Sequence, residues 1–166
     1  VKASSVLDGF AGTTRVSQAF AKLGCRVIAN DISAWSRVFA ACYLLNRKPR
    51  PAYQDLIDHL NALPGRDGWF TQHYGGEANG GCSIQKDGLK RPWQVHNTRR
   101  LDAIREEIER LKLGEVDKAV ALTSLILALD EVDNTLGHFA AYLKEWSPRS
   151  YHDLCLKVPD VQVNRL

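Results

Sequence analysis

Methionine is absent from this 166-residue chain, and its few cysteines are scattered. The four cysteines never form the C-x-x-C pair that is typical of zinc ribbons and thioredoxin-like redox sites. No apolar run is long enough to span a bilayer, and no signal peptide is visible. Isolated cysteines of this kind are typical of reduced, mostly buried thiols. We therefore expect a cytoplasmic protein with no bound metal and no membrane partner.

The residues that are present have the composition of an ordinary globular domain. Hydrophobic residues make up 45% and charged residues 25% of the chain, which is typical of soluble domains. The length suits one domain, or one domain with a modest insert. A formal net charge of +3 permits a nucleic-acid partner without indicating one. Because methionine is absent and Val1 directly precedes a strand-like run, we expect an N-terminus that has been trimmed or left incomplete.

The first 48 residues predict alternating strands and helices. Apolar and β-branched runs favour the strands, and apolar residues at helical spacing favour the helices. The expected order is strand, helix, strand and helix, at Val6–Phe10, Val16–Leu23, Arg26–Asn30 and Ser33–Leu45. This order is the beginning of a βαβ unit with a parallel sheet. We therefore expect an α/β fold in which residues 1–48 form a Rossmann-like cofactor-binding segment.

Residues 49–150 are expected to form a largely helical insert. A short helix at Asp55–Leu63 precedes an irregular stretch, rich in glycine and aromatic residues, at Gly65–Pro92. Two longer helices follow at Asn97–Leu113 and Val116–Leu129, the first of them capped by Asn97 or Thr98. Residues 151–166 are a strand or loop that we expect to return toward the α/β core.

The turn after the first strand has the properties of a nucleotide-binding loop. Its small residues let a ligand approach the backbone, and the N-terminus of the following helix offers unpaired N–H groups. Asp31 ends the second strand, 19 positions after Gly12, close to the spacing of about 20 expected for an acidic residue that binds ribose hydroxyls. Two alternatives stay open at this point: the turn binds nothing, and Asp31 only caps the next helix.

The glycine pattern favours S-adenosylmethionine over a dinucleotide. A pyrophosphate-binding turn prefers G-x-G-x-x-G, whereas this turn reads G-F-A-G-T-T and Ser17 takes the place of the last glycine. An adenosyl ligand without phosphates needs less of the helix terminus. We expect Asp31 to bind the ribose and Asp8 to lie near the methionine ammonium group. The predicted cofactor-binding residues are Asp8, Phe10, Ala11, Gly12, Thr13, Thr14, Asp31 and Ile32.

The run Phe10-Ala11-Gly12-Thr13-Thr14 resembles the F-x-G-x-G motif of DNA adenine-N6 methyltransferases, and its surroundings resemble the D12 class of that family. Two later stretches, Asn97–Arg105 and Asp130–Trp146, are also similar to that class, so the resemblance covers most of the chain. It implies a Rossmann-like methyltransferase core with an inserted target-recognition lobe, as in restriction-modification enzymes. The implied reaction transfers a methyl group from S-adenosylmethionine to adenine N6 in double-stranded DNA.

The chain departs from the family pattern in two places. Thr14 replaces the second glycine, which we expect the turn to tolerate if Thr14 has helical dihedral angles and its hydroxyl helps to cap the helix. No D-P-P-Y, N-P-P-Y or S-P-P-Y motif occurs anywhere. We therefore expect the chain to stop before that catalytic motif and we assign no catalytic residue. The missing segment is expected in the same chain or in a second subunit.

Basic residues around the irregular stretch suggest contact with DNA, mainly because of the resemblance. Such residues bind phosphates, and the neighbouring Trp93 and His96 offer rings for stacking. A solvated helix start with a packing tryptophan is the alternative. A module that kept the methyltransferase fold for DNA binding or regulation, without catalysis, is the alternative function. The predicted DNA-binding residues are Lys86, Lys90, Arg91, Arg99, Arg100 and Asn134.

Overall fold

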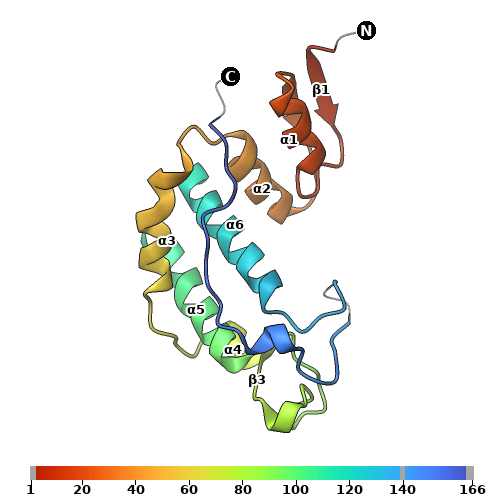
Figure 1. Cartoon of the computed structure of the whole chain (residues 1–166), viewed down its shortest axis with the longest axis vertical. Coiled ribbons are helices and arrows are strands. Elements are labelled where there is room, and N and C mark those ends of the chain that lie inside the picture. The colour runs from red at the N-terminus through yellow and green to blue at the C-terminus, as the bar shows by residue number, and fades with distance from the viewer. Residues whose placement is uncertain (1–2, 139–140, 164–166) are drawn as a thin grey trace. The chain divides into compact units, whose positions relative to one another are not determined.

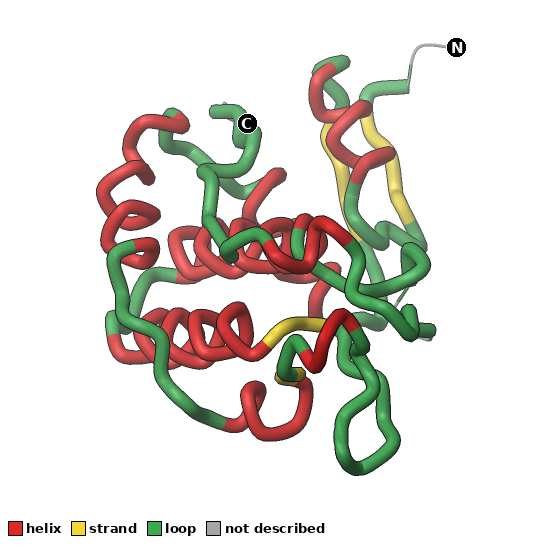
Figure 2. Tube along the Cα trace, turned by 60° about the horizontal axis from the view of Figure 1, so that its bottom comes forward, coloured by secondary structure: helices red, strands yellow, loops and turns green. Residues whose placement is uncertain are grey.

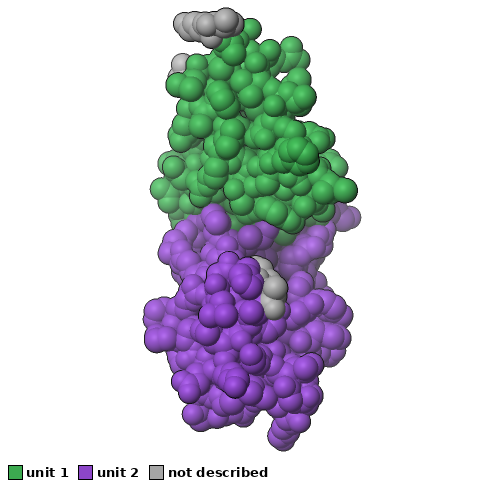
Figure 3. All heavy atoms as spheres, turned by 90° about the vertical axis from the view of Figure 1, so that its right-hand side faces the viewer, with its two compact units in different colours: residues 1–56, 113–124, 158–166 green, residues 57–112, 125–157 purple. Residues whose placement is uncertain are grey.

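A computed structural model describes residues 3–138 and 141–163 and has a mixed α/β fold (Figure 1). The chain forms two compact units, shown separately coloured in Figure 3. Unit 1 comprises residues 1–56, 113–124 and 158–166, and unit 2 comprises residues 57–112 and 125–157. The units interleave along the sequence, so the expected division at residues 48 and 150 into a core and an insert stays a prediction. Among the described residues, no helix combines the length and apolar character needed to cross a membrane.

Unit 1 begins with the strand–helix–strand–helix order that the sequence predicts. Strands β1 (Ser5–Asp8) and β2 (Arg26–Ala29) pair in parallel, and helix α1 (Arg15–Lys22) between them contacts both. Helix α2 (Ala34–Leu44) follows. The short 3-10 helix η1 (Arg50–Tyr53) comes next in the chain.

The two-stranded sheet of unit 1 has one covered face and one bare face. Leu7 lies opposite Ile28 in the register, and both side chains are exposed. Val6 lies opposite Val27, and both are partly buried on the face that α1 covers. Side chains alternate across a strand, so this pattern leaves an apolar surface on one side of the sheet. A parallel sheet is normally covered on both faces.

The core of unit 1 lies between helices. Helix α6 (Glu115–Glu131) begins in this unit. The Tyr53 hydroxyl donates a hydrogen bond to the side-chain oxygen of Asn46, and the Asn46 amide donates to the Gln162 carbonyl oxygen, which ties the segment around Gln162 to this unit. The buried apolar side chains come from α2, η1 and α6 and include Phe39, Ala41, Cys42, Tyr53, Ala119 and Val120.

Unit 2 is built around helix α5 (Val95–Arg110). Helix α4 (Trp69–Tyr74) packs on α5 and leads into β3 (Gly75–Gly76), which pairs in parallel with β4 (Trp93–Gln94). Helices α3 (Gln54–Asn61) and α6 are divided between the units, and unit 2 contains their residues from 57 and from 125 onward. The 3-10 helices η2 (Asn79–Gly81) and η3 (Pro148–Tyr151) also belong to unit 2. Its buried apolar side chains include Ile57, Leu60, Leu101, Ile104, Ile108, Leu125, Leu154 and Leu156.

The expected capping of α5 by Asn97 or Thr98 is wrong. The helix starts at Val95, two residues before Asn97, and the side chains of Asn97 and Thr98 are fully buried. The Asn97 amide donates to the His152 carbonyl oxygen, and its side-chain oxygen accepts from the Leu154 N–H. Asn97 therefore holds the extended segment after η3 against α5, a role that depends on residues more than 50 positions away.

A helix also lies within the stretch expected to be irregular. Helix α4 is stabilised at its start by Asp102 of α5, whose carboxylate accepts hydrogen bonds from the N–H groups of Phe70 and Thr71 at 2.9 and 2.8 Å. Such a cap satisfies N–H groups that a helix start leaves unpaired. Because the capping residue comes from another helix, the pattern around Trp69 does not reveal it.

Candidate functional site

The turn between β1 and α1 wraps over the carboxyl end of β2. The Asn30 N–H donates to the Asp8 carbonyl oxygen at 2.8 Å, and the Ala11 N–H donates to the Asn30 carbonyl oxygen at 2.9 Å. Gly12 has a φ of 50°, in the left-handed region that favours glycine. A β-carbon built on Gly9 or Gly12 would meet no atom within 4 Å. The backbone of the turn is therefore open to a ligand.

Asp31 ties this turn to the start of α2. One carboxylate oxygen accepts from the Gly12 N–H and the other from the Ser33 N–H, each at 2.8 Å. The two N–H groups, that of Ser33 first, hold the pKa of the Asp31 carboxyl below its ordinary value. The carboxylate is therefore ionised at neutral pH. Each of its oxygens has a second lone pair for a further donor.

Asp8 is held from α1. The hydroxyl of Ser17, which is fully buried, donates to the Asp8 carboxylate at 2.6 Å. Ser17 occupies the position where a dinucleotide-binding turn has its last glycine. Its side chain therefore has a use in this turn that glycine does not offer, which is to fix the orientation of Asp8.

The expectation of helical dihedral angles at Thr14 is wrong. Thr14 has φ 63° and ψ 15°, the left-handed conformation, and makes no side-chain cap. Its hydroxyl donates to the Thr13 carbonyl oxygen and accepts from the Gln18 amide. The backbone therefore keeps a conformation that suits glycine, although threonine is disfavoured there by about 1–2 kcal/mol.

Two apolar side chains of this segment are exposed, one in the turn and one directly after Asp31. Phe10 is 95% exposed and Ile32 is fully exposed, while Ala11 next to Phe10 is buried. Single exposed apolar residues are common on proteins, but here one belongs to a turn with an open backbone and the other follows an ionised acceptor in the chain. The arrangement offers apolar contact for a planar ring and an acceptor for hydroxyl groups.

The residues predicted to bind DNA divide into two groups. Arg100 donates to the carbonyl oxygens of Leu154 and Asn61, so it joins the extended segment to the helices of unit 2. Arg99 pairs with Asp67. Lys86 and Lys90 lie in a hairpin, residues 83–91, and neither ammonium group has a hydrogen bond or ion pair within the described residues.

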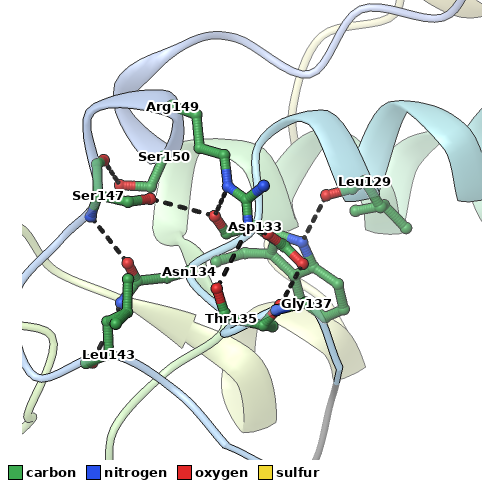
Figure 4. Close-up of polar contacts among 10 residues, drawn as sticks. Leu129, Asp133, Asn134, Thr135, Gly137, Leu143, Ser147, Arg149 and Ser150 are labelled. Atoms are coloured by element: carbon green, nitrogen blue, oxygen red, sulfur yellow. Dashed lines mark hydrogen bonds and ion pairs between the residues drawn. The ribbon is translucent and has the colours of Figure 1, made fainter.

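Asn134 belongs to a buried polar network rather than to an open surface (Figure 4). Its side-chain oxygen accepts from the Ser147 N–H at 2.8 Å, and its amide donates to the Leu143 carbonyl oxygen at 3.2 Å. Arg149 donates to the Asp133 carbonyl oxygen at 2.9 Å and pairs with the Asp133 carboxylate. The network joins the end of α6 to η3, and it leaves the fully buried Asn134 no access to a partner.

Sequence reasoning missed one exposed group and one half-exposed ring. Leu89, directly after the turn of the 83–91 hairpin, is 61% exposed, and Trp69 at the start of α4 is stacked on His73 at a ring distance of 4.6 Å. The position of Leu89 between Lys86 and Lys90 in a turn-rich segment is the sequence feature that could have indicated its exposure. In the described part of the chain, no three metal-ligating side chains converge.

Comparison with known proteins assigns the chain to a family. The model of the D12 class N6 adenine-specific DNA methyltransferases matches residues 2–163. The chain is 34% identical to the modification methylase StsI of Streptococcus sanguinis, over 91% of this chain and 24% of the relative. It is 29% identical to the type II methyltransferase M.NlaIII of Neisseria lactamica, over 90% of this chain and 44% of the relative.

The chain thus spans less than half the length of these curated relatives. No solved structure matches it. The match to the family model nevertheless covers nearly the whole chain and includes the turn, Asp31 and the 83–91 hairpin. The chain belongs to the D12 class N6 adenine-specific DNA methyltransferase family.

Proposed function

We propose that this chain is the S-adenosylmethionine-binding part of a site-specific DNA adenine-N6 methyltransferase that acts on double-stranded DNA. The observation that carries the proposal is the ionised Asp31 carboxylate, which binds the N–H of Gly12 in an open turn, together with the exposed Phe10 of that turn and the exposed Ile32 that follows Asp31. In a member of this family, such a group of residues has the chemistry that an adenosyl ligand needs.

The residues of the turn fit the parts of S-adenosylmethionine. Asp31 is the acceptor for the ribose hydroxyls, and Phe10 and Ile32 give apolar contact to the adenine ring. The open backbone at Gly12 lies under the adenosyl group, and Asp8, held by Ser17, attracts the ammonium group of the methionine part. When bound, the cofactor supplies an electrophilic methyl group, which these residues hold in a fixed place.

The residues that hold the target adenine are proposed to come from outside this sequence. Adenine N6 is a weak nucleophile because its lone pair is conjugated with the ring, so the enzyme must accept hydrogen bonds from the amino group and align it with the methyl group. The flipped base also needs a pocket with a stacking side chain. No D-P-P-Y-type motif occurs in this chain. Leu7 and Ile28 leave one apolar face of the sheet exposed. This exposed face is an argument that a further segment of the same enzyme, or a second subunit, packs there.

Calorimetric titration of the purified chain with S-adenosylmethionine tests the cofactor site. Wild type is expected to bind, and Asp31→Ala is expected to weaken binding by about 10-fold to 100-fold, because a charged hydrogen-bond acceptor contributes about 1.5–3 kcal/mol. Asp160→Ala, which removes an exposed carboxylate elsewhere in unit 1, is the matched control and is expected to bind as wild type does. Binding of NAD but not of S-adenosylmethionine would overturn the proposal.

One observation favours a second candidate, a DNA-binding or regulatory module without catalysis. Lys86 and Lys90 are available on the 83–91 hairpin, whereas the sequence lacks the catalytic motif. This candidate predicts binding of duplex DNA that does not change with S-adenosylmethionine. A cofactor titration with no heat change, by a chain that still binds duplex DNA, would favour it over the first.

A further inference from the structure

The 83–91 hairpin presents one apolar side chain between two basic ones. It extends away from the helices after η2, at the bottom of the view in Figure 2. Residues 86–88 form the turn, and Leu89, which directly follows it, is 61% exposed; Lys86 lies in the turn and Lys90 comes next after Leu89. Full burial of a leucine is worth about 1.5–3 kcal/mol, so an exposed leucine beside a projecting turn gives up much of that contribution.

The main chain of Leu89 is tied on both sides, although its side chain is exposed. Its N–H donates to the Asp87 carboxylate at 3.0 Å, and its carbonyl oxygen accepts from the Gln85 N–H at 3.0 Å. Arg91, whose side chain is largely buried, pairs with the same Asp87 carboxylate at 2.5 Å. These bonds fix the backbone of Leu89 beside the turn, and its side chain is exposed there.

The base of the hairpin is anchored to the rest of unit 2. The Ser83 N–H donates to the Lys144 carbonyl oxygen at 2.8 Å, and the Ser83 hydroxyl donates to the Leu143 carbonyl oxygen. The Gln85 side chain accepts from the Glu77 N–H at 2.9 Å and donates to the Glu77 carbonyl oxygen. The hairpin is therefore held by hydrogen bonds both at its base and next to the turn.

The charges favour DNA as the partner over an apolar protein surface. Residues 83–91 carry three basic side chains and one acidic one, and the acidic one, Asp87, is neutralised by Arg91. Lys86 and Lys90 have no hydrogen bond or ion pair in the described residues. A protein groove for leucine would have to desolvate both ammonium groups, whereas phosphates on either side of a base step neutralise them.

We propose that Leu89 is a wedge that enters between neighbouring base pairs of duplex DNA while Lys86 and Lys90 bind the flanking phosphates. Apolar side chains on DNA-binding proteins act in this way: they unstack a base step at a cost of a few kcal/mol and are supported by the surrounding contacts. The inference rests on the proposed function for the identity of the partner. It adds a residue that sets where the duplex is opened.

The test uses duplex DNA enriched by the wild-type chain from a pool of random sequences, with 2-aminopurine placed at each position in turn. This adenine analogue fluoresces when it is unstacked. Wild type is expected to raise the fluorescence next to one base step, and Leu89→Ala is expected to abolish that rise. Leu89→Ile keeps the apolar volume and is expected to restore it, while Leu23→Ala, an exposed leucine of unit 1, is expected to behave as wild type does.

The affinity measurements separate the wedge from the phosphate contacts. Leu89→Ala is expected to change the Kd by less than about tenfold and to leave its salt dependence unchanged, because no phosphate contact is lost. Lys86→Ala with Lys90→Ala is expected to reduce the slope of log K against log salt by about 2, since each phosphate contact contributes about 0.9. The unfolding midpoint of Leu89→Ala should equal that of wild type, because the side chain is exposed.

Three results would overturn the wedge. The first is a fluorescence rise that persists in Leu89→Ala. The second is a sedimentation shift in Leu89→Ala with unchanged DNA binding, which would assign Leu89 to a contact between copies of the protein. The third is a wild-type chain that binds no duplex although it binds S-adenosylmethionine. The calorimetric titration measures the cofactor site separately, so this last result leaves the cofactor proposal intact.

Discussion

Single residues in the turn carry most of the proposed cofactor chemistry, and Thr14 shows how one of them departs from its family pattern. The second glycine of the motif is replaced by threonine, yet the left-handed backbone is retained. Threonine adds a buried hydroxyl that bonds to Thr13 and Gln18, which offsets part of the conformational cost. The turn therefore has two compensated departures from the glycine pattern, at Thr14 and at Ser17.

At Thr14, replacement by glycine should be nearly neutral. Thr14→Gly relieves the left-handed strain but loses the hydroxyl contacts and gives a more flexible unfolded chain, so its free energy of unfolding should stay within about 1 kcal/mol of wild type. Ala19→Gly, at a right-handed position inside α1, should lower the free energy of unfolding by about 1 kcal/mol. Urea denaturation of both variants checks the difference. An equal loss in the two would mean that Thr14 is not strained.

Among the secondary-structure elements, helix α4 depends on α5 for its start. Six residues are too few for a stable isolated helix. Gly68 precedes this helix, and a β-carbon there would lie 2.6 Å from the Asp102 carboxyl carbon. The approach of the two elements therefore requires both the carboxylate and the glycine.

Removal of the Asp102 carboxylate should destabilise unit 2. Asp102→Ala leaves the N–H groups of Phe70 and Thr71 without partners, and the free energy of unfolding should fall by about 2 kcal/mol, at the upper end of the range for lost caps. Asp67→Ala, which breaks only the exposed pair with Arg99, should cost less than about 1 kcal/mol. Guanidinium denaturation is the measurement. Equal effects would contradict the role of Asp102 as a cap.

At the scale of the whole molecule, a feature could be predicted from the sequence when the residues that create it lie close together along the chain. The first two strands and helices follow from local apolar spacing, and so do the long helices α5 and α6. The burial of Asn97 and the presence of α4 do not, because each depends on a hydrogen bond between distant segments. The cofactor residues were identifiable because the turn is contiguous and Asp31 follows at a known spacing. Their binding role stays a prediction.

The dependence of stability on acid pH should include a contribution from Glu107. Hydrogen bonds from Arg110 and then His59 lower the pKa of Glu107 to about 2, from an ordinary value of 4.5. A lowered pKa stabilises the fold above the unfolded value, so this contribution should be complete above pH 4.5 and lost as the pH falls toward 2. The unfolding midpoint of Glu107→Gln should therefore depend less on pH in that window than the midpoint of wild type does. Parallel curves for Glu107→Gln and wild type would contradict the assignment.

The hydrogen bonds of the 83–91 hairpin make the side chain at position 89 independent of the fold. Gln85, Asp87 and Arg91 hold the backbone around Leu89, and none of these bonds involves the side chain at position 89. Under the proposed wedge, a substitution at this position would change the side chain that meets the duplex while the stability of the fold is kept. The residues of the proposed cofactor turn would be untouched, so the two proposed sites would be able to vary separately.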